Sequence, residues 1–292
     1  MNKPAFGGHG TENSSDGEVD RDPLAPIFRR SMFWTPERQA PSAWIEHVPF
    51  AFWLVDVLRP RTIVELGTHN GVSYSAMCQA VKSLGWATSC FAVDTWKGDE
   101  HAGFYPEDTY RDFAAFHDQR YSAFSQLVRS RFDDARPQFE DGSIDLLHID
   151  GMHTYEAVRH DYQSWLPKLS ANAVVLLHDT NVREREFGVH RLWSEITADK
   201  LHFSFLHGHG LGVLGHGRDY PDALRILFDA REDSGLAGSI REIFAALGRS
   251  LYLDAAVSAL HASTSWRITA PLRAARRLSG RLFRLTSGLA IR

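Results

Sequence analysis

Two short segments of this sequence gather acids and histidines in a pattern that suits chemistry. Asp150 and His153 follow one apolar run, and His178 and Asp179 follow another. Carboxylate oxygens and imidazole nitrogens bind divalent cations, so Asp150, His178 and Asp179 are candidate metal ligands. His153 is a candidate general base, because imidazole titrates near neutral pH. An acid–base pair without metal, and plain turn or capping roles, also fit these residues.

A glycine turn earlier in the chain suits a nucleotide cofactor. The apolar run 62–66 contains Glu65 and leads through Gly67 and Gly71 into a helical pattern. Glycine permits positive φ and close backbone approach, and a carboxylate can accept hydrogen bonds from an ammonium or a ribose. Asp94 ends a second apolar run, at the position where α/β folds bind ribose hydroxyls. The GxxxG spacing disfavours a dinucleotide fold, and the two run ends together predict a nucleoside site.

These residues require strands that end at one edge of a sheet. A buried helix at 49–58 precedes the first run, and helical patterns cover 71–84 and 155–166. Short apolar runs predict parallel strands at 62–66, 89–94, 127–128, 144–149 and 173–177, and a closing hairpin at 202–206 and 211–214. The expected fold class is therefore α/β: a doubly wound, mostly parallel, seven-stranded Rossmann-like sheet with a terminal antiparallel hairpin and a C-terminal helical extension.

The segment 96–126 exceeds an ordinary connection between a strand and a helix, so it is a candidate lid. Its aromatic and polar residues suit a sugar or phenolic acceptor, and packing alone would use them equally well. His148 is expected to be buried in its strand. His207, His209 and His216 are expected to have turn roles, although two of them could contact a substrate.

Composition divides the chain into a flexible acidic arm at 1–22, a cofactor-binding domain at 23–220 and a helical extension at 221–292. Residues 222–260 predict two amphipathic helices packed on the domain. Residues 265–286 predict a basic helix that caps the body or contacts a membrane surface or a partner.

The charge distribution and the apolar content limit which partners and which cellular location are expected. Residues 1–23 carry five acids and two bases, and residues 261–292 carry seven arginines and no acid, which leaves an acidic body. An acidic body argues against nucleic-acid partners. No transmembrane segment or signal peptide is evident, so a soluble, cytoplasmic protein is expected. Cys78 and Cys90 are expected to be buried free thiols.

With these residues in view, the chain resembles the class I S-adenosylmethionine-dependent methyltransferases over roughly residues 44–214. Val64–Gly71 resembles their first motif, with His69 where many members have glycine, and Val93–Trp96 resembles the second. The segments His148–Glu156 and Leu177–Asp179 are similar to a bacterial branch found with glycosyltransferases and in polysaccharide or glycoside pathways.

The resemblance implies an O-methyltransferase that acts on a hydroxyl of a sugar, a glycan or a glycosylated small molecule. It implies these cofactor-binding residues: Glu65, Gly67, Thr68, Asn70, Gly71, Ser73, Asp94, Thr95, Trp96 and Phe132. In the similar metal-dependent sugar O-methyltransferases, an aspartate after strand four and an acidic pair after strand five bind magnesium. Asp150, His178 and Asp179 take those places here, and His153 takes the base position. His178 departs from the usual carboxylate, which weakens the case for Mg²⁺ over another divalent cation.

Other functions remain open from the sequence. One is a cofactor-binding, non-catalytic module that scaffolds a glycan-assembly partner, such as a glycosyltransferase, through the basic C-terminal segment. Another is a non-methylating enzyme on the same fold, because fold does not fix the reaction. The acceptor and the oligomeric state are not determined by the sequence.

Overall fold

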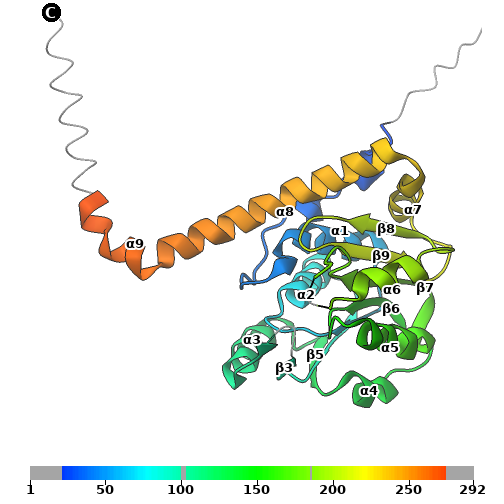
Figure 1. Ribbon diagram of the computed structural model, residues 1–292, viewed down its shortest axis with the longest axis horizontal. Coiled ribbons are helices and arrows are strands. Elements are labelled where there is room, and N and C mark those ends of the chain that lie inside the picture. The colour runs from blue at the N-terminus through cyan, green and yellow to red at the C-terminus, as the bar shows by residue number, and fades with distance from the viewer. Residues whose placement is uncertain (1–21, 100–102, 185, 274–292) are drawn as a thin grey trace, which may run out of the picture.

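The computed structural model describes residues 22–99, 103–184 and 186–273 of the 292-residue chain. A seven-stranded sheet at its centre has the order β5-β2-β1-β6-β7-β9-β8 (Figure 1). The strands are β1 (Thr62–Leu66), β2 (Ser89–Asp94), β5 (Ser125–Arg129), β6 (Ile144–Ile149), β7 (Leu169–His178), β8 (His202–Phe205) and β9 (Leu211–Gly215). The first five strands in this order, from β5 through β2, β1 and β6 to β7, pair in parallel. Strand β9 runs antiparallel to both β7 and β8. The predicted Rossmann-like sheet with a terminal hairpin is confirmed.

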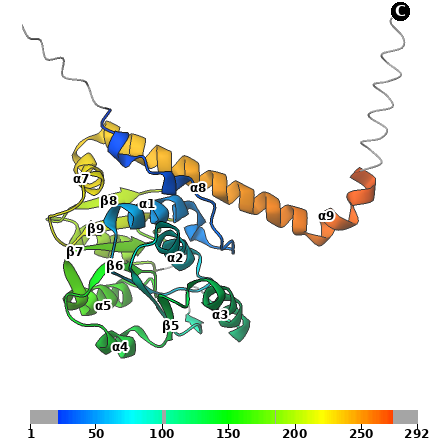
Figure 2. The same cartoon turned by 180° about the vertical axis from the view of Figure 1, so that it is seen from behind.

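Helices cover both faces of the sheet because alternate strand residues point to opposite sides. Ile63 and Leu146 belong to one apolar core, and their neighbours Val64 and Leu147 belong to the other. The first core packs against α1 (Val48–Leu58) and α2 (Val72–Leu84), and the second packs against α5 (Tyr155–Trp165) and α6 (Val189–Ile196). Figure 2 shows the same two layers from behind.

Helix α1 shows why an apolar segment precedes the sheet. Pro49 lies in its first turn, where a missing N–H costs nothing, and Arg59 ends it in the left-handed conformation. Nine of its eleven residues are buried, including Phe50, Phe52 and Trp53. The helix is thus a core element, as the sequence predicts.

The predicted lid is largely a packed element. A short hairpin of β3 (Gly98–Asp99) and β4 (Gly103–Phe104) leads into α3 (Glu107–Tyr121). Phe113, His117 and Tyr121 of α3 are buried. These side chains belong to the core, and among the described residues of 96–126 only Gly98 and Tyr105 line the main cavity.

Short helices complete the described chain. They are η1 (Ala25–Ile27), η2 (Arg30–Phe33), η3 (Ala43–His47), α4 (Phe132–Ala135), η4 (Arg136–Gln138), η5 (Leu166–Lys168), α7 (Asp222–Asp229), η6 (Ala230–Glu232) and α9 (Thr264–Ile268). The chain between α7 and α9 forms one long helix, α8 (Ser234–Ala262).

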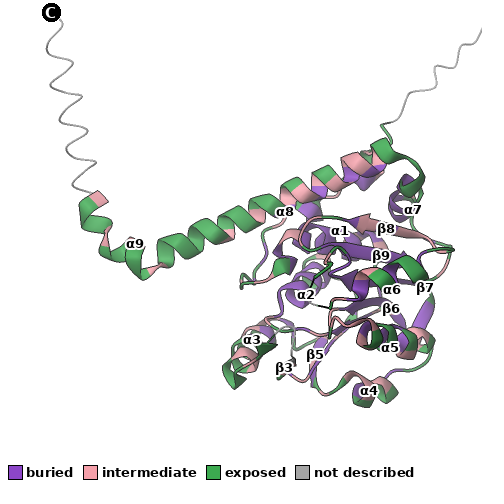
Figure 3. Ribbon diagram, in the orientation of Figure 1, coloured by how far each residue is buried: buried purple, intermediate pink, exposed green. Residues whose placement is uncertain are grey.

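Helix α8 is packed on the body only along its first half. Ala237, Ile240, Phe244 and Gly248 are buried, and the helix then continues away from the sheet (Figures 1 and 3). The expectation that residues 222–260 pack throughout on the domain is therefore wrong for the second half of α8. Most of the predicted basic helix at 265–286 lies outside the described residues.

Both cysteines are buried free thiols, as predicted. Among the described residues, α8 is the one helix long and apolar enough to cross a membrane by length and composition.

Candidate active site

The turn after β1 is held by the neighbouring strand ends. Gly67 and Gly71 have φ values of 88° and 71°, which strain any residue with a Cβ. A Cβ at Gly67 would lie 2.2 Å from the carbonyl oxygen of Asp150, and one at Gly71 would meet the ring of Phe113. These glycines are thus required by protein packing as well as by the shape of the turn.

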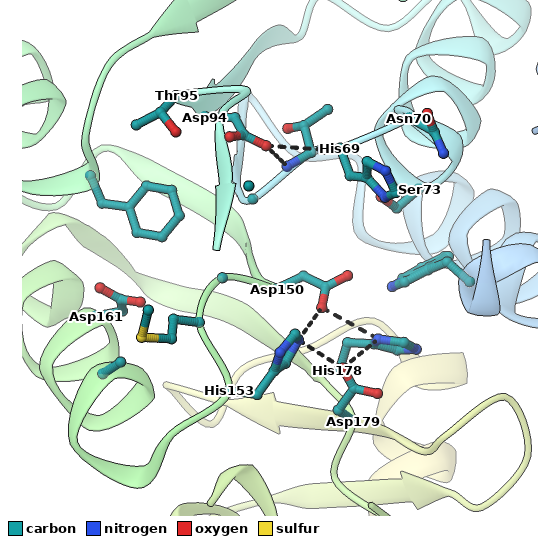
Figure 4. A pocket seen from close by; sticks show the side chains of 18 of the residues that line it. His69, Asn70, Ser73, Asp94, Thr95, Asp150, His153, Asp161, His178 and Asp179 are labelled. Atoms are coloured by element: carbon teal, nitrogen blue, oxygen red, sulfur yellow. Dashed lines mark hydrogen bonds and ion pairs between the residues drawn. The ribbon is translucent and has the colours of Figure 1, made fainter. Parts of the chain in front are cut away.

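Asp94 at the end of β2 fixes the same turn. Its Oδ2 accepts hydrogen bonds from the backbone N–H groups of Thr68 and His69 at 2.8 and 3.0 Å, and its Oδ1 accepts one from Trp96 at 2.7 Å (Figure 4). Each carboxylate oxygen offers two lone pairs, so Oδ2 is filled by its two N–H partners and Oδ1 retains room for one more donor. Asp94 can therefore both shape the turn and receive a hydroxyl.

Four side chains from two strand ends form what we call the acid–histidine cluster: Asp150, His153, His178 and Asp179. His153 Nε2 lies 2.9 Å from Asp179 Oδ2 and 3.6 Å from Asp150 Oδ1. His178 Nδ1 lies 3.3 Å from each of Asp150 Oδ1 and Asp179 Oδ2 (Figure 4). Ligand atoms of Asp150, His153 and Asp179 all lie within 4.8 Å of one another, as a metal site requires.

A backbone carbonyl determines how His178 meets this cluster. Its Nε2 lies 3.0 Å from the oxygen of Gly208, which can only accept a hydrogen bond, so Nε2 carries the proton. In a neutral imidazole, Nδ1 then presents a lone pair to the two aspartates. That position calls for a second proton or a cation.

The charges of the cluster shift the pKa values of its members strongly. Burial would lower the pKa of His153 and His178, but the adjacent Asp150 and Asp179 outweigh it and raise them to about 9 and about 10. Burial would raise the pKa of both aspartates, but the two imidazoles hold them below their usual range. Without a cation, the cluster is therefore two imidazolium–carboxylate pairs at neutral pH.

The backbone around the site is unusual. His69, Asp179 and His209 have positive φ although they carry side chains, and all three line the cavity. Such conformations persist where surrounding structure enforces them, and they concentrate at functional sites. Here Asp94 binds the His69 N–H, and His209 Nδ1 lies 3.2 Å from Asp179 Oδ1.

The opposite end of the cavity has an apolar slot and an acid. Phe132 begins α4, and a Cβ at Gly151 would lie 2.6 Å from its ring and 3.4 Å from Oδ2 of Asp161 on α5, so these two side chains lie close together. Met152, which follows β6, also lines the cavity. Burial raises the pKa of Asp161 to about 7. Within the described part of the chain, no protein group donates a hydrogen bond to this carboxyl, whose residue is 8% exposed.

Glu65 lies behind the cavity wall. Its carboxylate is fully buried, and Oε2 lies 2.7 Å from His148 Nδ1, while His148 Nε2 accepts a hydrogen bond from Trp44. Burial raises the pKa of Glu65, partly offset by His148 and Ser73. Ser73, which interacts with Glu65, lines the cavity, whereas Glu65 itself does not. The predicted burial of His148 is confirmed.

These parts border one cavity of about 870 Å³. The predicted site residues that line it are Gly67, Thr68, Asn70, Gly71, Ser73, Asp94, Thr95, Phe132, Asp150, His153, His178 and Asp179. Glu65 and Trp96 do not line it, and the 1% exposed indole of Trp96 donates to the His69 carbonyl instead. Trp44, Met152 and Asp161 also line the cavity and were not predicted from the sequence. Glu156, Ala157, His160 and Asp161 share one face of α5, and this helical spacing is the signal that could have found Asp161.

A second cavity of about 630 Å³ lies next to His209, which lines both. Its other lining residues are Asn181, Val182, Arg183, Glu184, Phe187 and Leu206. The ring of Phe187 stacks on His153 at 4.5 Å between centroids. The acid–histidine cluster thus lies at the junction of two cavities.

Comparisons with known proteins give a family match over part of the chain and one relative of high identity. A family model described as a methyltransferase domain matches residues 64–180. The uncharacterized protein y4gI of Sinorhizobium fredii is 50% identical over 214 residues, which are 73% of this chain and 23% of that protein. The chain therefore spans about a quarter of the length of this curated relative.

Solved structures give more distant likenesses. A methyltransferase from Geobacter sulfurreducens is 16% identical, with a TM-score of 0.44 over 65% of this chain and 80% of that one. The O-methyltransferase TomG from Streptomyces achromogenes, in complex with SAM, is 15% identical, with a TM-score of 0.43 over 63% and 83% of the two chains. The fold is established by the strand order of the sheet, and not by these identities and TM-scores.

Proposed function

We propose that the chain is an S-adenosylmethionine-dependent O-methyltransferase, because residues 64–180 match a family model described as a methyltransferase domain. We further propose that its acceptor is a hydroxyl of a sugar, a glycan or a glycosylated small molecule. One observation carries the proposal: a single cavity joins the glycine turn and Asp94 to the acid–histidine cluster. A cofactor cradle and a group that can handle a hydroxyl proton therefore face the same space.

The residues present fit the cofactor. S-adenosylmethionine supplies an electrophilic methyl group when it is bound. The turn residues Gly67, Thr68, Asn70, Gly71 and Ser73 would hold its methionine end, Asp94 would accept the ribose hydroxyls, and Thr95 and Phe132 would flank adenine. Asp161 would accept a hydrogen bond from the exocyclic amine of adenine, because its carboxyl is buried without a protein donor.

A divalent cation fits the acid–histidine cluster. Asp150, His178 and Asp179 would hold it, and it would lower the pKa of an acceptor hydroxyl when bound. The lone pair of His178 Nδ1 between two carboxylates supports this fit. A set that includes imidazole suits Mn²⁺ or Zn²⁺ better than Mg²⁺, which prefers oxygen ligands.

His153 would take the acceptor's proton. Its Nε2 faces Asp150 and Asp179, and both carboxylates stabilise the imidazolium that forms. A cation bound by Asp150 and Asp179 would neutralise their charge and lower the pKa of His153 from about 9 toward its ordinary value. The imidazole would then be neutral and able to act as a base. Phe187, stacked on the ring, holds its orientation.

The second cavity would receive the acceptor. Asn181, Arg183 and Glu184 offer hydrogen-bonding groups there, and Phe187 offers an aromatic face. This mixture suits a sugar ring, which has polar edges and an apolar face.

Calorimetric titration of the full chain with S-adenosylmethionine and S-adenosylhomocysteine, with and without Mg²⁺ or Mn²⁺, tests the cofactor assignment. Binding in the micromolar range is expected, and Phe132→Ala should weaken it about tenfold through lost stacking area. Phe33→Ala, which replaces a 60% exposed ring elsewhere, is the matched control. Absence of binding to both compounds under every condition would reject the methyltransferase assignment and favour a scaffolding role.

Methyl transfer from labelled cofactor to a panel of sugars and glycosides then tests the reaction. With an accepted substrate, His153→Gln should lower kcat by about 10²–10⁴, while the affinity for S-adenosylhomocysteine stays within about twofold. Unchanged turnover in this variant would remove His153 from the mechanism. Transfer to phenols but never to sugars would replace the acceptor class and leave the reaction intact.

A further inference from the structure

The second half of α8 exposes apolar side chains that no part of the described chain covers. Tyr252, Leu253, Val257 and Leu260 are 49–54% exposed, and Ile268 and Leu272 beyond them are 71% and 72% exposed. Leu253, Val257 and Leu260 have the i, i+4, i+7 spacing of a single helix face. Figure 3 shows this half of α8 and α9 as an almost wholly exposed arm. A continuous apolar surface of this kind marks an interaction site.

The positive charge of residues 255–292 favours one type of binding partner for this apolar face, an anionic one. Residues 255–292 contain seven arginines, no lysine and no acid, whereas the body of the chain is acidic. Among the described arginines, Arg267 lies next to Ile268, and Arg273 lies over the ring of Trp266 at 3.8 Å. Apolar, aromatic and arginine side chains on one arm match a membrane interface with anionic headgroups.

The packing of α8 determines how the arm can meet a membrane. The buried residues Ala237, Ile240, Phe244 and Gly248 tie its first half to the body, so this half is unavailable for lipid. Leu251 still packs on the core, so the exposed part is residues 252–262, which are about 16 Å long at 1.5 Å per residue. This length is shorter than the ~30 Å hydrocarbon core. The arm can therefore lie in the interface but cannot span the bilayer.

We propose that residues 252–273, which we call the α8–α9 arm, dock the protein peripherally on an anionic lipid surface. Tyr252, Leu253, Val257 and Leu260 insert among the acyl chains, and Arg267 and Arg273 contact lipid phosphates. This attachment is independent of the methyl-transfer chemistry, because the arm contributes no residue to either cavity.

Vesicle flotation of the full chain tests this docking. Wild-type protein should float with vesicles of equal phosphatidylglycerol and phosphatidylcholine, should not float with phosphatidylcholine alone, and should be released by high salt. The double variant Leu253→Ser/Leu260→Ser should bind about tenfold more weakly, and Arg267→Gln about fivefold more weakly. Phe33→Ser and Arg218→Gln, which change an exposed ring and an exposed arginine on the body, should bind like wild type.

Three outcomes would overturn the proposal. Wild-type protein that stays unbound with anionic vesicles would exclude a lipid surface. Equal binding by wild type and the Leu253/Leu260 variant would exclude the arm as the contact. A dimer in light scattering that this variant makes monomeric, without vesicle binding by either protein, would assign the face to a second copy of the chain. Matching far-UV circular dichroism confirms that the variants remain folded.

Discussion

The Gly208 carbonyl links the acid–histidine cluster to the turn before β9. It accepts hydrogen bonds from Nε2 of both His178 and His47, at 3.0 and 3.1 Å. Nε2 of His178 keeps its proton for the Gly208 carbonyl, so only Nδ1, which faces Asp150 and Asp179, can bind either a proton or a cation. A proton and a cation would therefore compete for the same place, so the proposed metal binding should depend on pH.

We expect the affinity for Mn²⁺ to rise at least about tenfold between about pH 7 and about pH 9. The raised pKa values of His153 and His178, about 9 and about 10, mean that a cation must displace protons at neutral pH. Calorimetry in buffers of different ionisation enthalpy measures both the affinity and the protons released. The control Asp134→Asn, which changes an exposed acid, should show the same pH dependence as wild type. A Mn²⁺ affinity that does not change with pH in the wild type would contradict the prediction.

Asp161 gives a second prediction about a single residue. Its folded pKa of about 7 lies above its ordinary value, because burial disfavours the charge. Its contribution to stability is thus complete below about pH 4 and is lost as the pH rises through 7. Asp161→Asn should therefore raise the free energy of unfolding by about 1–3 kcal/mol at pH 8 and by much less at pH 5.

Urea denaturation at the two pH values measures this difference. Asp134→Asn, in an exposed position, should change stability equally little at both. An Asp161→Asn effect that is the same at pH 5 and pH 8 would show that the carboxyl is ionised throughout. The same variant should also weaken S-adenosylhomocysteine binding if adenine is its partner.

The sequence predicted much of the site because strand ends in a parallel sheet converge. Asp94, Asp150, His178 and Asp179 each end or follow an apolar run, and all four reach one cavity. Trp96 and Asp161 could not be placed in this way. Whether Trp96 points into the site depends on the turn after β2, and Asp161 lies inside a helix whose pocket face is set by tertiary packing.

At the scale of elements, strand boundaries were predictable where apolar runs end sharply. The ranges 62–66, 89–94 and 144–149 match β1, β2 and β6. Strand β7 begins four residues before the expected 173, because the polar segment Ser170–Asn172 disguises its start. A register irregularity between β6 and β7 accommodates that segment. Pairing with a neighbour, rather than local composition, determines where this strand begins.

Two glycines in α8 provide a matched test of where this helix touches the body. A Cβ at Gly248 would lie 2.0 Å from the carbonyl oxygen of Glu46, whereas a Cβ at Gly238 would meet nothing within 4 Å. Gly248→Ala should destabilise the protein by about 1–3 kcal/mol through overpacking against backbone. Gly238→Ala should stabilise it by about 0.5–1 kcal/mol through helix propensity. Equal effects in chemical denaturation would contradict the crossing of α8 over η3.

At the scale of the whole molecule, the described chain is a packed body with a helical arm. The sequence could not reveal the arm, because Leu253, Val257 and Leu260 have the same periodicity whether they face a core or solvent. Only the positions of the last buried residue, Gly248, and of Leu251, which still packs on the core, show where packing ends. The peripheral contact and the cytoplasmic location remain predictions.

Hydrogen exchange should separate body from arm. Amides of residues 250–262 should exchange at least about tenfold faster than those of 238–248 in the same helix, because an isolated helix of this length is marginal in water. Mass spectrometry of the full chain in the absence of lipid measures both segments. Equal protection along α8 would mean that a partner covers the second half. Anionic vesicles should slow exchange in 250–262 alone.

The contact between Gly67 and Asp150 has a consequence for how such an enzyme can change its substrate. The Asp150 N–H donates to the Leu66 carbonyl at 2.8 Å, and the absent Gly67 side chain leaves room for the Asp150 carbonyl. The donor cradle and the first cluster residue thus form one rigid backbone unit. Under the proposed function, we therefore expect acceptor preference to be separable: exchange of segment 181–184 between relatives should change the acceptor, while Phe187 on His153 and the Gly67–Asp150 unit keep donor and base aligned.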